Sequence, residues 1–329
     1  MKKIVFTILT VLFITINLPA YADQEAKEIL KAVVKIRSII PKEAHSAGTL
    51  GTEREGNGVV IDSNGHILTI GYLIIEAESI EVTPPEGKPV SATFVGYDHA
   101  TGFGLLKTEA PLNVKPMKMG QSSKVKEGEP VLIAGFGGED AVQAARVISR
   151  KEFTGYWEYL LEEALYTAPA FVNYGGSALI DRNGLLVGIG SLFSQVVIPG
   201  FGTIPCNISV PIDLLPPILN DLITKGRPQK APRPWLGINA EEGQGRVFIT
   251  RVTPGGPAEK GGLKPGDLVL TVKGREMSGL TDFYRKIWAL GNAGVEVPLA
   301  ILQGIQIREI TIRSSDRYQF LTLKPQKVL

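Results

Sequence analysis

Short apolar runs separated by turn residues dominate the first two thirds of the chain, and they predict many short β-strands. The first set of expected strands comprises Ala32–Arg37, Gly58–Ile61, His66–Thr69, Ser79–Val82, Ala92–Tyr97 and Gly104–Lys107. The second set comprises Val131–Ala134, Arg146–Ser149, Leu165–Ala168, Ser177–Ile180, Leu185–Gly190 and Asn207–Val210. Many short strands broken by Gly and Asn are typical of β-barrels and β-sandwiches.

Three segments depart from this strand pattern. Glu152–Leu165 is rich in aromatic and acidic residues, and we expect it to be partly helical. Ile212–Thr224 has the amphipathic spacing of a helix, although Pro216-Pro217 disturbs its first turn. Residues 226–234 are basic, Pro-rich and poor in apolar side chains, which predicts an extended linker.

The chain after this linker, residues 235–329, is expected to form a separate α+β domain. Its predicted strands are Trp235–Ile238, Val247–Val252 and Leu268–Val272, followed by a terminal hairpin of Val295–Leu302 and Ile305–Ile312. A short helix is expected over Pro257–Leu263, and an amphipathic helix over Thr281–Leu290. Ser278 or Thr281 would cap the second helix.

Composition sets broad limits on the function. The chain has 329 residues, of which 44% are hydrophobic and 21% charged, so it can build two or three packed domains. The formal net charge is +2, and no basic patch is interleaved with aromatic residues. Neither nucleic acid nor an anionic membrane surface is therefore expected as a partner.

The N-terminus has the three parts of a secretory signal peptide. Lys2 and Lys3 precede the apolar stretch Ile4–Leu18, and Ala20-Tyr21-Ala22 fits a cleavage site. We expect residues 1–22 to be removed and the mature protein to be periplasmic or secreted. No later segment is long and apolar enough to predict a membrane span.

Candidate metal and cofactor sites are not found in the sequence. Cys206 is the only cysteine, which excludes an internal disulfide, and its apolar flanks predict a buried, unreactive thiol. No metal-ligand spacing of the HExxH or CxxC type occurs. Gly135-Phe136-Gly137-Gly138 lacks the Lys-Ser/Thr pair of a phosphate-binding loop, so a β-turn is expected there.

The last domain resembles a PDZ domain of the bacterial, circularly permuted type. The similarity rests on residues 255–274, where a turn, a short helix, a second turn and a strand follow in the expected order. PDZ domains add an extended chain end to a sheet edge and hold its carboxylate on a backbone loop. The resemblance implies that this loop is Trp235-Leu236-Gly237-Ile238. The helix bearing Phe283 and Ile287 would form the opposite wall, unless these two side chains only pack the core.

The preceding part, from about residue 30 to residue 225, resembles the HtrA/Deg family of periplasmic serine proteases. The matching segments are residues 56–61, 66–69, 101–107, 128–135, 177–180, 184–190 and 207–208. This resemblance implies a mainly β protein, with a chymotrypsin-like double β-barrel over residues 23–225 before the linker and the PDZ domain. It also implies oligomers, often trimers.

The family's three catalytic positions are all occupied by other residues in this chain. Where the family has the His of Leu-Thr-Asn-x-His-Val, this chain has Tyr72. The Asp of Thr-Asp-Leu-Ala-Leu-Leu-Lys corresponds to Gly102, and the Ser of Gly-Asn-Ser-Gly-Gly corresponds to Gly175. The general base, the residue that orients it and the nucleophile are therefore replaced together.

These replacements remove the chemistry of a serine protease. The imidazole takes the serine proton and the aspartate holds the imidazole in the right tautomer, whereas a phenol has a pKa of about 10 and stays protonated. Loss of a whole triad costs on the order of 10⁶-fold in turnover. We therefore predict a pseudoprotease, not an enzyme, that binds C-terminal or unfolded protein segments through its PDZ domain.

Two alternatives remain open at this stage. Ser177 could act as a displaced nucleophile with His99 and Asp98, which would require substantial remodelling of the site. Alternatively, the chain could be a structural or regulatory subunit that joins active HtrA-like oligomers.

Overall fold

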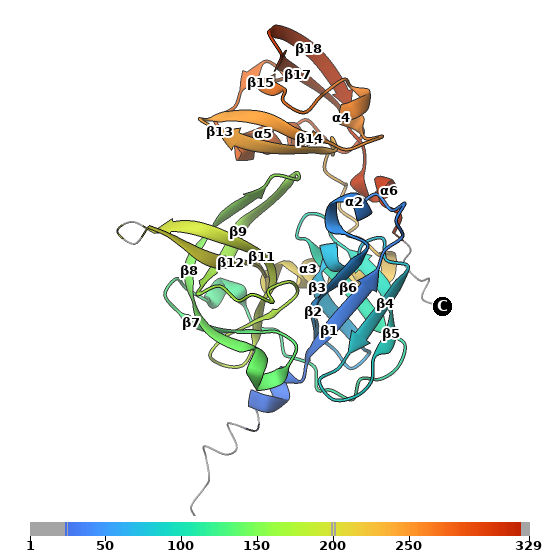
Figure 1. Cartoon of the computed structure of the whole chain (residues 1–329), viewed down its shortest axis with the longest axis vertical. Coiled ribbons are helices and arrows are strands. Elements are labelled where there is room, and N and C mark those ends of the chain that lie inside the picture. Colours follow the sequence, from blue (N-terminus) through green and yellow to red (C-terminus); the bar gives the residue numbers. More distant parts are fainter. Residues whose placement is uncertain (1–23, 25, 199, 201, 324–329) are drawn as a thin grey trace, which may run out of the picture.

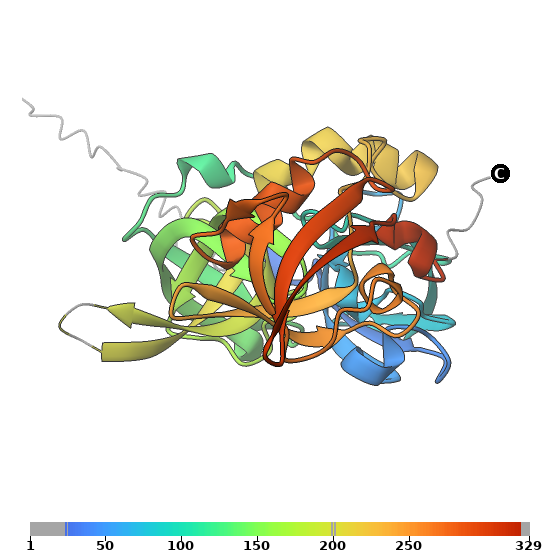
Figure 2. The same ribbon diagram turned by 90° about the horizontal axis from the view of Figure 1, so that it is seen from above.

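The computed structural model describes residues 24, 26–198, 200 and 202–323, which form two β-barrels and a smaller domain above them (Figure 1). The expected signal peptide, residues 1–22, lies outside the described residues. Seen from above, the smaller domain covers the region between the barrels (Figure 2). The prediction of a mainly β protein is confirmed.

The first barrel is a closed sheet with the strand order β1-β2-β3-β6-β5-β4. Its strands are β1 (Val33–Ile39), β2 (Glu53–Val60), β3 (His66–Ile70), β4 (Ser79–Thr83), β5 (Val90–Tyr97) and β6 (Phe103–Thr108). Inward-facing residues such as Ile36, Leu68 and Leu105 are fully buried. A short helix α2 (Ala47–Leu50) lies between β1 and β2, and β2 starts earlier than expected because Glu53 pairs with Ile39.

The second barrel is closed in the order β10-β11-β12-β9-β8-β7. Its strands are β7 (Pro130–Ala134), β8 (Val142–Gly155), β9 (Tyr159–Ala168), β10 (Ala178–Ile180), β11 (Leu186–Ile198) and β12 (Gly202–Pro211). Short 3₁₀ turns at Ser122–Lys124 and Gly138–Ala141 flank β7. The barrel's long β8–β9 hairpin rises toward the smaller domain (Figure 1).

This hairpin shows that the expected helical character of Glu152–Leu165 is wrong. Phe153 pairs with Leu161, and Gly155 pairs with Tyr159 at the end of the ladder. Aromatic side chains are favourable on strands, and the rings of Phe153 on β8 and Tyr159 on β9 lie with centroids 6.3 Å apart. Cross-strand pairing therefore determines the structure of this segment, and its composition does not predict it.

The C-terminal domain contains one sheet with the order β13-β14-β15-β17-β18, to which β16 is added at β15. The elements are β13 (Ile238–Gly243), β14 (Arg246–Val252), α4 (Pro257–Lys260), β15 (Leu268–Val272), β16 (Arg275–Glu276), α5 (Leu280–Trp288), β17 (Glu296–Gln303) and β18 (Gln306–Arg313). The predicted terminal hairpin is confirmed by the pairing of β17 with β18. The expected cap of α5 is wrong, because Gly279 occupies the N-cap position and the Ser278 N–H donates to Asp282 instead.

The helix expected over Ile212–Thr224 is divided into a 3₁₀ turn, Ile212–Leu214, and the helix α3 (Pro216–Lys225). The two prolines begin this helix rather than disturb it. The N–H groups of a first helical turn have no acceptor within the helix, so the missing N–H of a proline is not lost from the helix there. Gly226 ends α3 in a left-handed conformation. Its carbonyl accepts a 3.0 Å hydrogen bond from the Tyr97 N–H, which ties the helix to the first barrel.

The last described residues return to the first barrel. The sheet of the C-terminal domain ends at Arg313, and a one-turn helix, α6 (Arg317–Phe320), follows. The Tyr318 hydroxyl accepts from the His99 N–H and donates to Asp98. Thr322 N–H donates to Glu76. The expected domain of residues 235–329 therefore contains a segment that packs outside its own sheet.

Within the described part of the chain, no helix combines the length and the apolar content that are needed to cross a bilayer.

Candidate functional site

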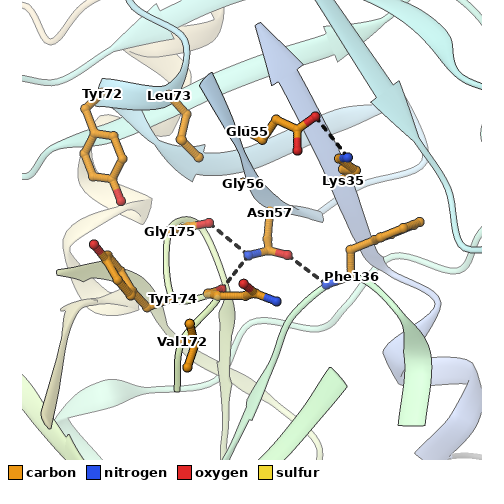
Figure 3. A pocket seen from close by; sticks show the side chains of 11 residues that line it. Lys35, Glu55, Gly56, Asn57, Tyr72, Leu73, Phe136, Val172, Tyr174 and Gly175 are labelled. Carbon is orange, nitrogen blue, oxygen red and sulfur yellow. Dashed lines mark hydrogen bonds and ion pairs between the residues drawn. The ribbon is translucent and has the colours of Figure 1, made fainter. Parts of the chain in front are cut away.

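Tyr72, Gly102 and Gly175, which the sequence matches to the three catalytic positions of the protease family, lie close together between the two barrels. Tyr72 belongs to a 3₁₀ turn, Gly71–Leu73, directly after β3. Gly102 lies just before β6, and its carbonyl accepts a 2.7 Å hydrogen bond from the Gly71 N–H. Gly175 lies in the loop before β10 and faces Tyr72 (Figure 3). The fold thus brings together the three positions at which the sequence departs from the motifs of the protease family.

Tyr72 and Gly175 are sterically complementary. A Cβ atom built on Gly175 would lie 2.8 Å from the Tyr72 hydroxyl oxygen, which is too close for an unstrained contact. The hydroxyl instead donates a 2.9 Å hydrogen bond to the Ser191 carbonyl on β11. Burial raises the pKa of the Tyr72 phenol, so it remains a donor and cannot accept a proton from a nucleophile.

The Gly102 position is closed by a residue of the second barrel. Gly102 has φ +82°, a conformation that favours glycine. A Cβ atom there would lie 3.2 Å from the Tyr159 hydroxyl oxygen. This hydroxyl donates a 2.6 Å hydrogen bond to the Thr101 carbonyl. Tyr159 therefore occupies the space into which an orienting carboxylate would extend.

The loop before β10 is held by Asn57 of β2. The Asn57 Nδ2 donates to the Asn173 and Gly175 carbonyls at 2.7 and 3.0 Å, and its Oδ1 accepts from the Phe136 N–H at 2.8 Å (Figure 3). The adjoining cavity has a volume of about 460 Å³ and includes Lys35, Glu55 and Tyr174 in its lining. A cavity therefore lies beside Tyr72 and Gly175, between the two barrels.

The displaced triad is not assembled in the structure. Ser177 is 1% exposed, and its hydroxyl has no hydrogen-bond partner among the described residues. The His99 Nδ1 lies 3.0 Å from the Arg317 Nη1, and burial lowers the pKa of His99. Asp98 accepts from the Ala100 and Thr101 N–H groups of its own turn.

The other candidate side chains are engaged elsewhere. The His66 Nδ1 lies 2.7 Å from an Asp62 carboxylate oxygen, and the His45 ring packs on Phe320. Cys206 is buried as expected, and burial raises the pKa of its thiol. Among the described residues, no group of His, Cys, Asp and Glu side chains has a metal-binding arrangement.

The loop predicted to bind carboxylates does hold one, and it comes from the same chain. The N–H groups of Leu236, Gly237 and Ile238 donate to the Glu158 carboxylate at 2.8, 2.9 and 3.1 Å. Glu158 lies at the tip of the β8–β9 hairpin and is 2% exposed. Gly237 has φ +78°, which lets the loop turn its donors toward one acceptor.

The apolar residues predicted for the peptide groove lie deeper than expected. Leu236, Ile238, Phe283 and Ile287 are all buried in the core of the C-terminal domain. Trp235 is also buried, and its ring packs on Phe320 of α6. The loop therefore contacts Glu158 through its backbone, whereas these side chains hold the loop in place.

Glu158, Tyr159 and Tyr284 were not identified from the sequence as functional residues. The Tyr284 hydroxyl of α5 accepts a 3.2 Å hydrogen bond from the Glu158 N–H. The one available signal was the run Tyr156-Trp157-Glu158-Tyr159, a single acid among three aromatic residues. Such a run is unusual at a hairpin tip facing solvent, and a buried contact explains it.

Two domain families match different parts of the chain, and individual relatives match across both. The trypsin-like peptidase domain family matches residues 56–189, and the PDZ domain family matches residues 227–302. A probable periplasmic serine protease do/HhoA-like of Haemophilus influenzae is 28% identical over 275 residues, which cover 78% of this chain and 57% of the relative. A probable periplasmic serine endoprotease DegP-like of Pseudomonas putida is 28% identical over 264 residues, with coverages of 75% and 53%. The chain thus spans little more than half the length of these relatives.

Solved structures show the same fold. A structure described as HtrA-type protease AlgW with decapeptide aligns with a TM-score of 0.51 at 22% identity, over 91% of this chain and 99% of the other. The likeness covers both barrels and the C-terminal domain, so the expected order of domains is confirmed.

The contact between Tyr72 and Gly175 predicts that a serine cannot simply be restored. We expect Gly175→Ser to lower the free energy of unfolding by about 1–3 kcal/mol, the usual cost of overpacking. In a Tyr72→Ala background the cost should be clearly smaller, because the opposing hydroxyl is gone. Urea denaturation of the four chains as a double-mutant cycle measures this coupling.

Gly48→Ser is a matched control, because a Cβ atom on Gly48 meets no atom within 4 Å. It should leave the stability almost unchanged. Strictly additive effects of Tyr72→Ala and Gly175→Ser would contradict the steric complementarity of the two positions.

The buried carboxylate predicts a pH-dependent stability. Burial raises the pKa of Glu158 from 4.5 to about 7, against the opposing effect of its N–H donors and of Arg317. Because the folded state binds this proton more tightly, its contribution to stability is present below pH 4.5 and is lost as the pH rises to about 7. Relative to Glu158→Gln, the wild-type chain should therefore lose stability over this range in urea denaturation. Glu163→Gln, at an exposed position of the same hairpin, is the control substitution.

Proposed function

Because the chain is an HtrA/Deg-like protein with a trypsin-like peptidase domain followed by a PDZ domain, we propose that it is a secreted pseudoprotease. Its double barrel serves as a scaffold, and its PDZ domain binds the C-terminal or unfolded segments of other proteins. The relatives are described as serine proteases, whereas this chain is proposed to lack protease activity.

The Tyr72–Gly175 contact carries the proposal of lost catalysis. The phenol occupies the space that a serine side chain would need, only 2.8 Å from the built Cβ position. It is fixed there by its hydrogen bond to Ser191. Tyr159 likewise occupies the space next to Gly102, where its hydroxyl is fixed by the hydrogen bond to the Thr101 carbonyl. Neither a base nor a nucleophile is therefore supplied at these positions.

The contacts of the displaced triad also support this proposal. A general base must reach the proton that it abstracts, directly or through one water. The His99 ring instead lies against the Arg317 guanidinium, which disfavours a protonated imidazole. Ser177 is enclosed beside Gly190, whose built Cβ would lie 2.3 Å from the Ser177 hydroxyl oxygen.

Peptide binding by the PDZ domain is supported by the donor loop. Three consecutive N–H groups converge on a single carboxylate, as required for capture of a chain terminus. A protein of similar fold is described as binding a decapeptide. C-terminal segments of other proteins are accordingly the proposed partners of this chain.

The proposed location is the periplasm, since the relatives are described as periplasmic and residues 1–22 have the pattern of a cleaved signal. Self-association as a trimer, or assembly with active HtrA-like chains, is expected from the family resemblance. Light scattering of the mature chain, alone and with such a relative, distinguishes these two assemblies from a monomer.

The loss of catalysis predicts that residues 23–329 stay unlabelled by a fluorophosphonate probe and do not cleave casein. An active HtrA-like relative, treated in parallel, should be labelled and should cleave. Ser177→Ala should leave both results for this chain unchanged. A probe adduct on Ser177, found by mass spectrometry, would overturn the pseudoprotease proposal.

Peptide capture through the donor loop predicts selectivity for a free carboxylate. We expect the mature chain to bind a library of free-acid decapeptides about tenfold or more tightly than the same peptides with amidated C-termini, since hydrogen bonds to a charged group each contribute about 1.5–3 kcal/mol. Fluorescence anisotropy measures both sets. Equal affinities for the two sets would contradict binding at the 236–238 loop.

A further inference from the structure

We infer that the tip of the β8–β9 hairpin, Tyr156-Trp157-Glu158, is an internal ligand of the PDZ domain, which a partner's C-terminus must displace. This inference rests on the proposed peptide-binding function and adds a mechanism of regulation to it. The hairpin bridges the second barrel and the PDZ domain (Figure 1).

The first argument is the position of the carboxylate. One oxygen of Glu158 accepts from Leu236, and the other accepts from both Gly237 and Ile238. A chain terminus would offer the same two oxygens to the same donors. The two carboxylates cannot bind together, so the contact excludes a peptide from this loop.

The second argument is the register of the backbone. The Tyr156 carbonyl, two residues before Glu158, accepts a 2.8 Å hydrogen bond from the Ala240 N–H, two residues after Ile238. From the Glu158–Ile238 contact, the next contact lies two residues toward the N-terminus in the tip and two residues toward the C-terminus in β13. This is the pattern of antiparallel pairing. The tip therefore follows β13 as an added strand would, with its carboxylate at the loop.

The third argument comes from the opposite wall, the helix α5. Besides the Tyr284 contact, the Thr281 hydroxyl lies 2.6 Å from the hydroxyl of Thr154. Arg285 forms an ion pair with Glu152 at 2.6 Å. The hairpin thus contacts both β13 and α5, the two elements between which a PDZ ligand lies.

The conformation of Glu158 is set by the hairpin itself. It has φ +59°, the left-handed conformation that is usual for the last residue of a three-residue hairpin loop. Release of the tip therefore breaks its contacts with the 236–238 loop without requiring the hairpin to change its turn, which makes displacement by a partner feasible.

An internal ligand lowers the apparent affinity for a partner by the fraction of chains in which the groove is free. Because the tip is tethered, its effective concentration at the groove is high. Only partners that bind the open groove well, or that are abundant, would then displace it. The PDZ domain would consequently respond to an accumulation of exposed chain ends.

The test compares the full mature chain with Glu158→Ala, using the free-acid decapeptide library. We expect Glu158→Ala to bind these peptides about tenfold or more tightly, because the groove is no longer occupied. Tyr284→Phe, which removes only the hydroxyl acceptor, should give a smaller increase and provides a second variant with an intact core. Glu163→Ala is the matched control, since Glu163 is exposed on the same hairpin and pairs with Arg150.

Hydrogen exchange separates this inference from the proposed function. The amides of residues 236–238 and 240 should be protected in the wild-type chain and should exchange faster in Glu158→Ala, whether or not a peptide binds. Faster exchange without peptide binding in either chain supports the internal ligand and counts against the peptide-binding function. Unchanged exchange, or measurable peptide binding with the same affinity in the wild-type chain and in Glu158→Ala, would overturn the inference.

Discussion

Buried backbone donors need acceptors, and this constraint sets the relation between the barrels and the PDZ domain. The turn at Gly237 points three N–H groups at one position, and leaving them unpaired in a buried interface would be costly. Glu158 supplies the acceptor from the second barrel. The hairpin, the linker and the returning tail around α6 then hold the PDZ domain above both barrels.

Two tyrosine side chains fill the space beside two of the glycines between the barrels. Each glycine faces a tyrosine hydroxyl, Gly175 that of Tyr72 and Gly102 that of Tyr159. Both hydroxyls donate to backbone carbonyls, so no polar group of these phenols is left unpaired. Next to the cavity, the two barrels are thereby joined by packed, hydrogen-bonded contacts.

Much of this architecture follows from local sequence patterns, because alternating apolar residues and turn glycines act over short distances. The short strands and the terminal hairpin of the PDZ domain were predictable for that reason, whereas the closure of the strands into two barrels was expected only from the resemblance to the HtrA/Deg family. Glu152–Leu165 was mispredicted because its strand form depends on cross-strand pairing and on the contact between the Phe153 and Tyr159 rings. The role of Glu158 could not be predicted either, because its partners lie about eighty residues away in the sequence. These partners are backbone N–H groups, which nearly every residue type carries, so the sequence does not single them out.

The PDZ loop and the cleft between the barrels are connected through two neighbouring residues of the β8–β9 hairpin. Glu158 accepts hydrogen bonds from the loop, while Tyr159 donates one to the Thr101 carbonyl beside Gly102. A partner that displaces Glu158 therefore acts on a residue covalently joined to the one that packs against Gly102. The hairpin is thus the contiguous physical connection through which occupancy of the PDZ groove would reach the cleft.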